Sequence, residues 1–153
     1  MSSDLSRQLI EQTPFGTSII AEDIVDTLSF FDDWEERYRY IIDLGKQLPE
    51  FPLSMQTEDR IVHGCQSQVW LEVDSQLGDG KVRMAADSDA IIVKGLVAMI
   101  LAALNNKTPA AIADYDMEDY FVRVDLVKHL SPTRGNGVRA MVERIKADAA
   151  KLA

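Results

Sequence analysis

The only cysteine of the chain, Cys65, stands between a short apolar run and a strand-like segment. Gly64 precedes it and three polar residues follow it. A glycine at this point allows a sharp turn, which predicts a thiol on a loop between two strands, where reactive groups are common. Free cysteine is also among the most buried residue types, so the position is compatible with packing. The spacing indicates a candidate nucleophile, and a lone cysteine indicates no more than that.

A reactive thiol at this position would need local help to ionise. The thiolate is the nucleophile, and a cysteine with a pKa of about 8.5 is only slightly ionised at neutral pH. His63, two residues before the thiol, and Arg134, near the last predicted helix, are the candidate activators. A solvated side chain is the alternative for His63, and Arg134 could equally cap carbonyls or pair with an acid.

Several other classes of chemistry fit the residues less well. A closed zinc or iron–sulfur site needs several thiol or imidazole ligands, whereas the chain has one cysteine and two histidines, His63 and His129. We therefore expect neither a metal nor a cofactor. A cysteine–histidine hydrolase lacks an orienting acid and an oxyanion-hole signature. A thiol redox protein stays open, although it would need a resolving thiol from a partner.

Length and charge set further bounds. A chain of 153 residues suits one domain, so we expect a single domain over residues 1–153, with residues 1–18 as a possible N-terminal arm. A net charge of −9 argues against nucleic acid as a partner. The longest apolar run, near residues 91–104, is shorter than the ~20 residues of a membrane span, and we expect no secretory signal. These features predict a cytoplasmic protein.

Helical periodicity appears on both sides of the cysteine. Short helices are expected over residues 21–30, 110–113, 118–121 and 126–129, and longer ones over 34–48, 89–104 and from Ser131 or Thr133 onward. Asp32 or Asp33 is the predicted N-cap of the second helix, and residues 87–89 supply the predicted cap of the central one. Thr108-Pro109 predicts a helix with proline in its first turn.

Three strands are predicted around the candidate thiol. Residues 61–62 form a short apolar strand, residues 68–74 alternate with period two, and residues 81–86 return after a glycine-rich turn at 78–80. Trp70 falls on the face opposite the apolar set, where simple packing is favoured over a place in a cysteine pocket. The sequence therefore predicts an α+β fold, a small three-stranded antiparallel sheet covered by helices.

Four segments, in order, resemble the SufE family, including its CsdE branch. Residues 63–71 resemble the family's G-C-x-S-x-V-W motif, and residues 34–49 resemble W-E-x-x-Y…I-x-L-G-x-x-L-P. Residues 87–96 are similar to D-S-D…I-V-x-G-L, and residues 131–137 to S-x-x-R-x-x-G. Residues 13–17 look like the CsdE branch, whereas residues 65–68 look more like SufE itself.

The resemblance implies a SufE/NifU-like fold and a function. Family members accept sulfur from a cysteine desulfurase, here SufS-like or CsdA-like, and pass it to an iron–sulfur scaffold or another acceptor. Cys65 would then be the sulfur-carrying residue. The supporting residues implied are His63, Gly64, Gln66, Asp89 and Arg134. A non-carrier activator of the desulfurase is a further alternative. We also expect Asp87 and Asp89 to present an acidic surface to a basic partner.

Overall fold

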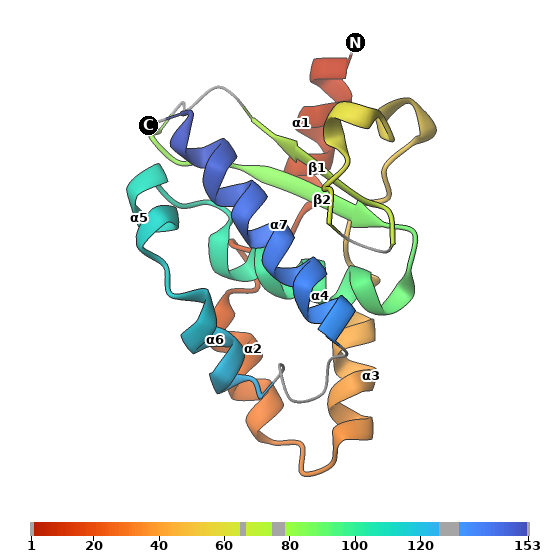
Figure 1. The fold of residues 1–153 in the computed structure, drawn as a ribbon, viewed down its shortest axis with the longest axis vertical. Helices are drawn as coiled ribbons and strands as arrows, with labels where there is room; N and C mark the ends of the chain where they lie inside the picture. Colours follow the sequence, from red (N-terminus) through yellow and green to blue (C-terminus); the bar gives the residue numbers. More distant parts are fainter. Residues whose placement is uncertain (1, 65–66, 75–78, 126–131, 153) are drawn as a thin grey trace.

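The structure, a computed structural model, describes residues 2–64, 67–74, 79–125 and 132–152 (Figure 1). Its elements in chain order are α1 (Ser2–Gln12), α2 (Ala21–Ser29), α3 (Trp34–Gly45), the 3₁₀ helices Leu53–Met55 and Glu58–Arg60, β1 (Val69–Val73), β2 (Met84–Ser88), α4 (Ile91–Leu104), α5 (Pro109–Asp114), α6 (Met117–Arg123) and α7 (Pro132–Ala150). The result is the predicted α+β single domain, with a small antiparallel sheet covered by helices.

Helix α4 is the centre of the core. Every residue from 95 to 104 is buried, because the helix is apolar around its whole circumference. Helix α3 packs against it so closely that a Cβ atom on Gly95 would lie 2.3 Å from the carbonyl oxygen of Ile41. A Cβ on Gly45 would in turn lie 2.5 Å from the backbone nitrogen of Gly95. The two helices therefore meet backbone to backbone at a pair of glycines.

The two faces of the sheet pack against different clusters. Strand β1 runs antiparallel to β2, with Val69 opposite Ser88 and Val73 opposite Met84. One face joins the core around α4 and the other joins a smaller cluster that includes Trp70 and residues of α1. The smaller cluster consists of Leu9, Ile10, Phe51, Met55, Trp70 and Ala85. Trp70 is only 6% exposed, which confirms the prediction that it packs.

The sequence predicted three strands in the sheet, and this number was wrong. Among the described residues the sheet has two strands, and Ile61 joins it through a single isolated bridge to Trp70. The 3₁₀ helix Glu58–Arg60 ends directly before Ile61 and a turn begins at His63, so there is no room for a longer pairing. Strand β2 begins at Met84, because Val82 instead bridges to Lys107.

Two of the three helix caps were predicted correctly. Asp33 accepts a hydrogen bond from the Glu36 amide at 2.8 Å, and Thr108 caps α5 with Pro109 at its start. The cap predicted over residues 87–89 was wrong, since α4 begins at Ile91 after Ala90 and has no side-chain cap. Asn106, just past the end of α4, takes the left-handed conformation with φ 64°, which asparagine tolerates better than most residues.

The buried Asp87 serves the fold in another way. Its carboxylate accepts from the Phe51 amide at 2.9 Å and from the Ser88 amide at 2.8 Å. The ammonium of Lys94 lies 3.3 Å away. A carboxylate that is 2% exposed contributes nothing to a protein surface, so the expectation of an acidic surface fails for Asp87 and stands only for Asp89, which is exposed.

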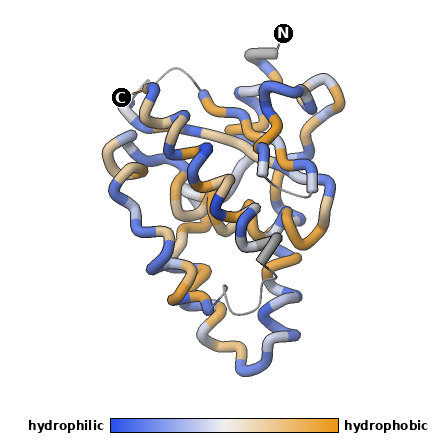
Figure 2. Tube along the Cα trace, viewed as in Figure 1, coloured by the Kyte–Doolittle hydropathy of each residue, from blue (hydrophilic) through white to orange (hydrophobic). Residues whose placement is uncertain are grey.

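The remaining helices cover the core. Helix α7 crosses the molecule in front of α4 and the sheet (Figure 1), and its apolar residues, whose helical spacing predicts an inward face, are buried. These are Val138, Met141, Val142, Ile145 and Ala149. The helix predicted over 126–129 and the turn at 78 lie outside the described residues. The turn between α2 and α3, at the far end from both termini, consists of two phenylalanines followed by two aspartates, so in Figure 2 it changes from hydrophobic to hydrophilic.

Candidate functional site

The candidate site is a hairpin that carries the cysteine. Its incoming arm is residues 59–64 and its outgoing arm is residues 67–70; we call residues 59–70 the cysteine hairpin. Cys65 and Gln66 lie outside the described residues, so the site is built from the two arms. The Val62 amide donates to the Val69 carbonyl at 2.8 Å, beside the bridge between Ile61 and Trp70. The arms are therefore tied together at the base.

The outgoing arm is fixed at Gln68 through backbone groups. The Gln68 amide donates to Oδ1 of Asp89 at 3.0 Å, and the Asp89 amide donates to the Gln68 carbonyl at 3.2 Å. The hydroxyl of Ser88 donates to the same carbonyl at 2.7 Å. Asp89, one of the supporting residues implied by the family resemblance, thus lies next to the hairpin. It provides hydrogen-bond partners for the backbone N–H and C=O groups of Gln68 in the outgoing arm.

The incoming arm is fixed by helix α7. The guanidinium of Arg144 donates to the carbonyls of Asp59 and Ile61, each at 2.9 Å. Further along the arm, Gly64 has φ +98°, and a Cβ atom placed on it would lie 3.0 Å from the Cβ of Ala140. The positive φ therefore favours glycine strongly, and a side chain at this position would also press tightly against α7.

A partly buried ion pair reinforces the start of the incoming arm. Nε of Arg60 lies 2.7 Å from Oε2 of Glu72, with both side chains less than a fifth exposed. Arg60 also donates to the hydroxyl of Thr57 at 2.8 Å, and that hydroxyl donates to Asp59 at 2.6 Å. The hydrogen bond from Thr57, with Arg60 and Arg144 nearby, holds the pKa of Asp59 below its ordinary value. This segment is ordered by charge-assisted bonds.

The structure describes the side chain of only one of the two predicted activators of the thiol, His63 and Arg134. The His63 side chain is 74% exposed, and its Nε2 lies 3.7 Å from the similarly exposed carboxylate of Glu58. Arg134 belongs to the first turn of α7, and its side chain lies outside the described residues. Their action on the Cys65 thiol stays a prediction.

Sequence reasoning missed the part that Arg144 plays. The signal was available, since Ala140, Arg144 and Asp148 recur at steps of four on α7 and share one stripe of its surface. On such a stripe, a small residue leaves room for another segment to approach, and a charged pair offers it hydrogen-bond partners. The identity of that segment could not be read, because it lies about eighty residues earlier in the chain.

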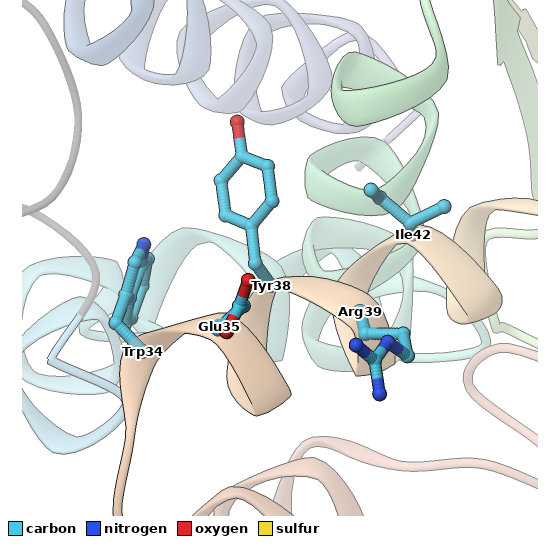
Figure 3. A pocket seen from close by; sticks show the side chains of 5 residues that line it. All are labelled: Trp34, Glu35, Tyr38, Arg39 and Ile42. Carbon is cyan, nitrogen blue, oxygen red and sulfur yellow. The ribbon is translucent and has the colours of Figure 1, made fainter.

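Among the hollows that described residues line, two shallow ones lie outside the cysteine hairpin. One, of about 520 Å³, runs along α3 and is lined by Trp34, Glu35, Tyr38, Arg39 and Ile42 (Figure 3). The helical spacing of the aromatic residues of α3 predicts that they belong to the core, but Trp34 and Tyr38 are half-buried and line this hollow. The second, of about 300 Å³, lies between α6 and α7.

Two features are absent from the described residues, a cluster of metal ligands and a membrane-spanning helix. No group of three or more histidine, cysteine, aspartate or glutamate side chains in the described part of the chain is arranged to hold a metal ion. No helix among these residues combines the length and apolarity that crossing a membrane requires.

Comparison with known proteins gives a family. The model of the family described as SufE, Fe-S metabolism associated domain, matches residues 22–149. An uncharacterized SufE-like protein of Rhizobium meliloti (strain 1021) is 45% identical over 131 residues, which are 84% of this chain and 93% of that protein. A second uncharacterized SufE-like protein, from Rhizobium etli, is 46% identical over 131 residues, which are 84% of this chain and 88% of that protein.

A solved structure agrees in fold. The solution structure of a hypothetical protein from Thermus thermophilus superposes with a TM-score of 0.69, covering 86% of this chain and 94% of that one at 21% identity. The domain description connects the matched residues with iron–sulfur metabolism. On the family match and the two relatives, the chain belongs to the SufE family.

Proposed function

We propose that the chain is a sulfur acceptor, which takes a persulfide sulfur from a cysteine desulfurase onto Cys65 and passes it on for iron–sulfur cluster assembly. In this proposal it also stimulates the desulfurase, and it works in the reducing cytoplasm, where a single cysteine remains a free thiol. The desulfurase is SufS-like or CsdA-like, and the next acceptor is an iron–sulfur scaffold or a related protein.

The observation that carries the proposal is the anchoring of both arms of the cysteine hairpin. On one side of Cys65 and Gln66, the nearest described residue is Gly64, which contacts α7. On the other side it is Ser67, which precedes Gln68, and the backbone of Gln68 is hydrogen-bonded to Asp89 and Ser88. A thiol that must meet a sulfur atom on another protein benefits from a loop held on a rigid scaffold. The family membership supports the same role.

The proposed step balances without an external oxidant or reductant. The Cys65 thiolate attacks the terminal sulfur of the donor persulfide, in the way that a thiolate attacks a disulfide. A new sulfur–sulfur bond forms on Cys65 while the donor's sulfur–sulfur bond breaks, and the donor cysteine leaves as a thiolate. One proton is exchanged with solvent when the starting thiol ionises and the leaving thiolate is protonated.

Replacement of Cys65 by serine tests the proposal. Serine is nearly the size of cysteine, but its hydroxyl is un-ionised at neutral pH and cannot accept sulfur. We expect wild type, incubated with desulfurase, pyridoxal phosphate and cysteine, to gain the mass of one sulfur atom, and Cys65→Ser to gain none while still binding the desulfurase. Wild-type protein alkylated beforehand is a second control, because the chain has no other cysteine.

The same experiment separates the alternatives. If Cys65→Ser stimulates alanine release by the desulfurase as strongly as wild type, the chain is an activator and not a carrier. If Cys65 forms a sulfenic acid with peroxide but no persulfide with desulfurase and cysteine, the protein is a thiol redox protein. Either outcome overturns the proposal.

A further inference from the structure

Helix α7 contacts the incoming arm of the cysteine hairpin along one stripe. Ala140 approaches Gly64, and one turn later Arg144 donates to the carbonyls of Asp59 and Ile61. Another turn on, Oδ2 of Asp148 accepts from Nε of Arg144 at 3.0 Å. The arm is thus held at three residues by a helix that is distant in sequence.

The geometry of Arg144 suits this task. Its two terminal nitrogens bond separate carbonyls while its Nε bonds a carboxylate, so the rigid fork of the guanidinium is engaged on both sides. Its side chain is 29% exposed and that of Asp148 is 21% exposed, so solvent screens these bonds only in part. A lysine ammonium, being a single point, does not reproduce this fork.

We propose that Arg144 is a positioning residue for sulfur transfer, which fixes the incoming arm of the cysteine hairpin on α7 and so sets where Cys65 meets the donor sulfur. This rests on the proposed function of Cys65. Arg144 acts through the backbone of Asp59 and Ile61 and takes no part in the chemistry. Transfer between two proteins depends on the approach of two sulfur atoms within a fixed geometry, so a displaced arm lowers its rate.

Two readouts distinguish positioning from simple loss of stability. Without Arg144 the arm is free to leave α7, so we expect Cys65 in Arg144→Ala to react with iodoacetamide about threefold faster, as for a locally opened segment. Sulfur uptake from the desulfurase, measured in single turnover by mass spectrometry, should fall about tenfold because the approach geometry is lost. Arg144→Lys should lie between wild type and Arg144→Ala in both measurements.

The chain provides a matched control in Lys146. This residue also projects from α7 and donates to two backbone carbonyls, those of Ala113 at 3.3 Å and Tyr115 at 2.8 Å, far from the hairpin in the chain. Lys146→Ala removes comparable bonds, and we expect it to leave both alkylation and sulfur uptake at wild-type rates.

The experiment distinguishes failure of the positioning role of Arg144 from failure of the proposed sulfur-acceptor function. If wild type accepts no sulfur, the proposed function fails, and alkylation still reports whether Arg144 holds the hairpin. If wild type accepts sulfur and Arg144→Ala does so at the same rate, the positioning role is overturned. The same conclusion follows if Arg144→Ala and Lys146→Ala change both readouts equally, since that pattern reports stability alone.

Discussion

The contact between α3 and α4 and the cysteine hairpin are held together by different forces. At the helix contact, Gly45 and Gly95 let two backbones touch, and the adjoining Ile41 side chain is buried. In the hairpin, side chains from elsewhere bond backbone groups, as Arg144 does at Ile61 and Asp89 does at Gln68. The helix contact depends on the exact volume of its residues, whereas the hairpin depends on hydrogen-bond donors and acceptors placed around it.

This difference separates stability from activity. Changes at the helix contact alter a close-packed interior and therefore lower the free energy of unfolding. Changes around the hairpin alter the position of residues whose side chains are exposed, such as His63 and Gln68, and remove little buried area. Variants of the helix contact should therefore change mainly the free energy of unfolding, and variants around the hairpin mainly the rate of sulfur uptake.

The largest effect on stability is expected from Gly95→Ala. The added Cβ would meet the Ile41 carbonyl oxygen at 2.3 Å and the Ile41 Cγ2 at 2.6 Å, so α3 and α4 must move apart. The added Cβ would overpack the contact between the α4 backbone and the α3 backbone, neither of which can move aside easily. We expect the free energy of unfolding to fall by about 3 kcal/mol. Urea denaturation of wild type and variant measures the loss.

Gly135→Ala is the matched control for that variant. Gly135 also lies in a helix, α7, but among the described residues a Cβ there would meet only the end of the Arg139 side chain, at 3.8 Å. Alanine favours a helix over glycine by up to about 1 kcal/mol, so this variant should be unchanged or slightly more stable. Equal destabilisation by both substitutions would contradict the glycine contact between α3 and α4.

Gly64→Ala should have a smaller effect on stability and a larger one on activity. The φ of +98° and the contact at 3.0 Å with Ala140 together should cost about 1–2 kcal/mol and lift the arm from α7. We expect sulfur uptake to fall by about tenfold, because the geometry of approach changes.

Gly80→Ala controls for the backbone strain alone. Gly80 has φ +80°, and a Cβ placed on it meets no atom within 4 Å in the part of the chain that the structure describes. It should lose stability comparably to Gly64→Ala and accept sulfur as wild type does. If both variants lose sulfur uptake to the same degree, the contact of Gly64 with α7 has no role in positioning the hairpin.

Local sequence signals predicted much of the fold. Helix α4 followed from an apolar run that is hydrophobic all round, and Asp33 and Thr108 marked the starts of α3 and α5. The alternation over residues 68–74 predicted β1, and it placed Trp70 on the opposite face from its apolar neighbours. These features are set by residues within a few positions of one another, so their pattern is visible in the sequence.

The errors came from contacts between distant segments. Asp87 looked like a helix cap, but its carboxylate is used by the Phe51 amide, thirty-six residues earlier in the chain. The strand predicted over residues 61–62 is a single bridge because a 3₁₀ helix adjoins it. Arg144 was missed for the same reason, since its partners at Asp59 and Ile61 cannot be read from the local pattern of α7.

The smallest effect is expected from Glu22→Gln, at a site belonging to neither region. Glu22 in α2 receives two hydrogen bonds from Arg123 in α6, at 2.9 and 2.7 Å, and these hold the pKa of the carboxyl below its ordinary value. A lowered pKa means that the pair stabilises the fold above the ordinary pKa and that this stabilisation is lost as the pH falls through the folded value. Both side chains are largely exposed, so the contribution is small and is screened by salt.

Thermal unfolding of wild type and Glu22→Gln between pH 7 and pH 3 tests the sign of this linkage. We expect wild type to melt slightly higher at pH 7 in low salt, with the difference closing as the pH falls through the lowered pKa of the Glu22 carboxyl. Glu35→Gln is the control, because Glu35 is likewise the second residue of its helix, α3, and shares the favourable place near a helix N-terminus. A difference that persists at pH 3, or that Glu35→Gln reproduces in full, would mean that Arg123 adds nothing to the stability of the contact between α2 and α6.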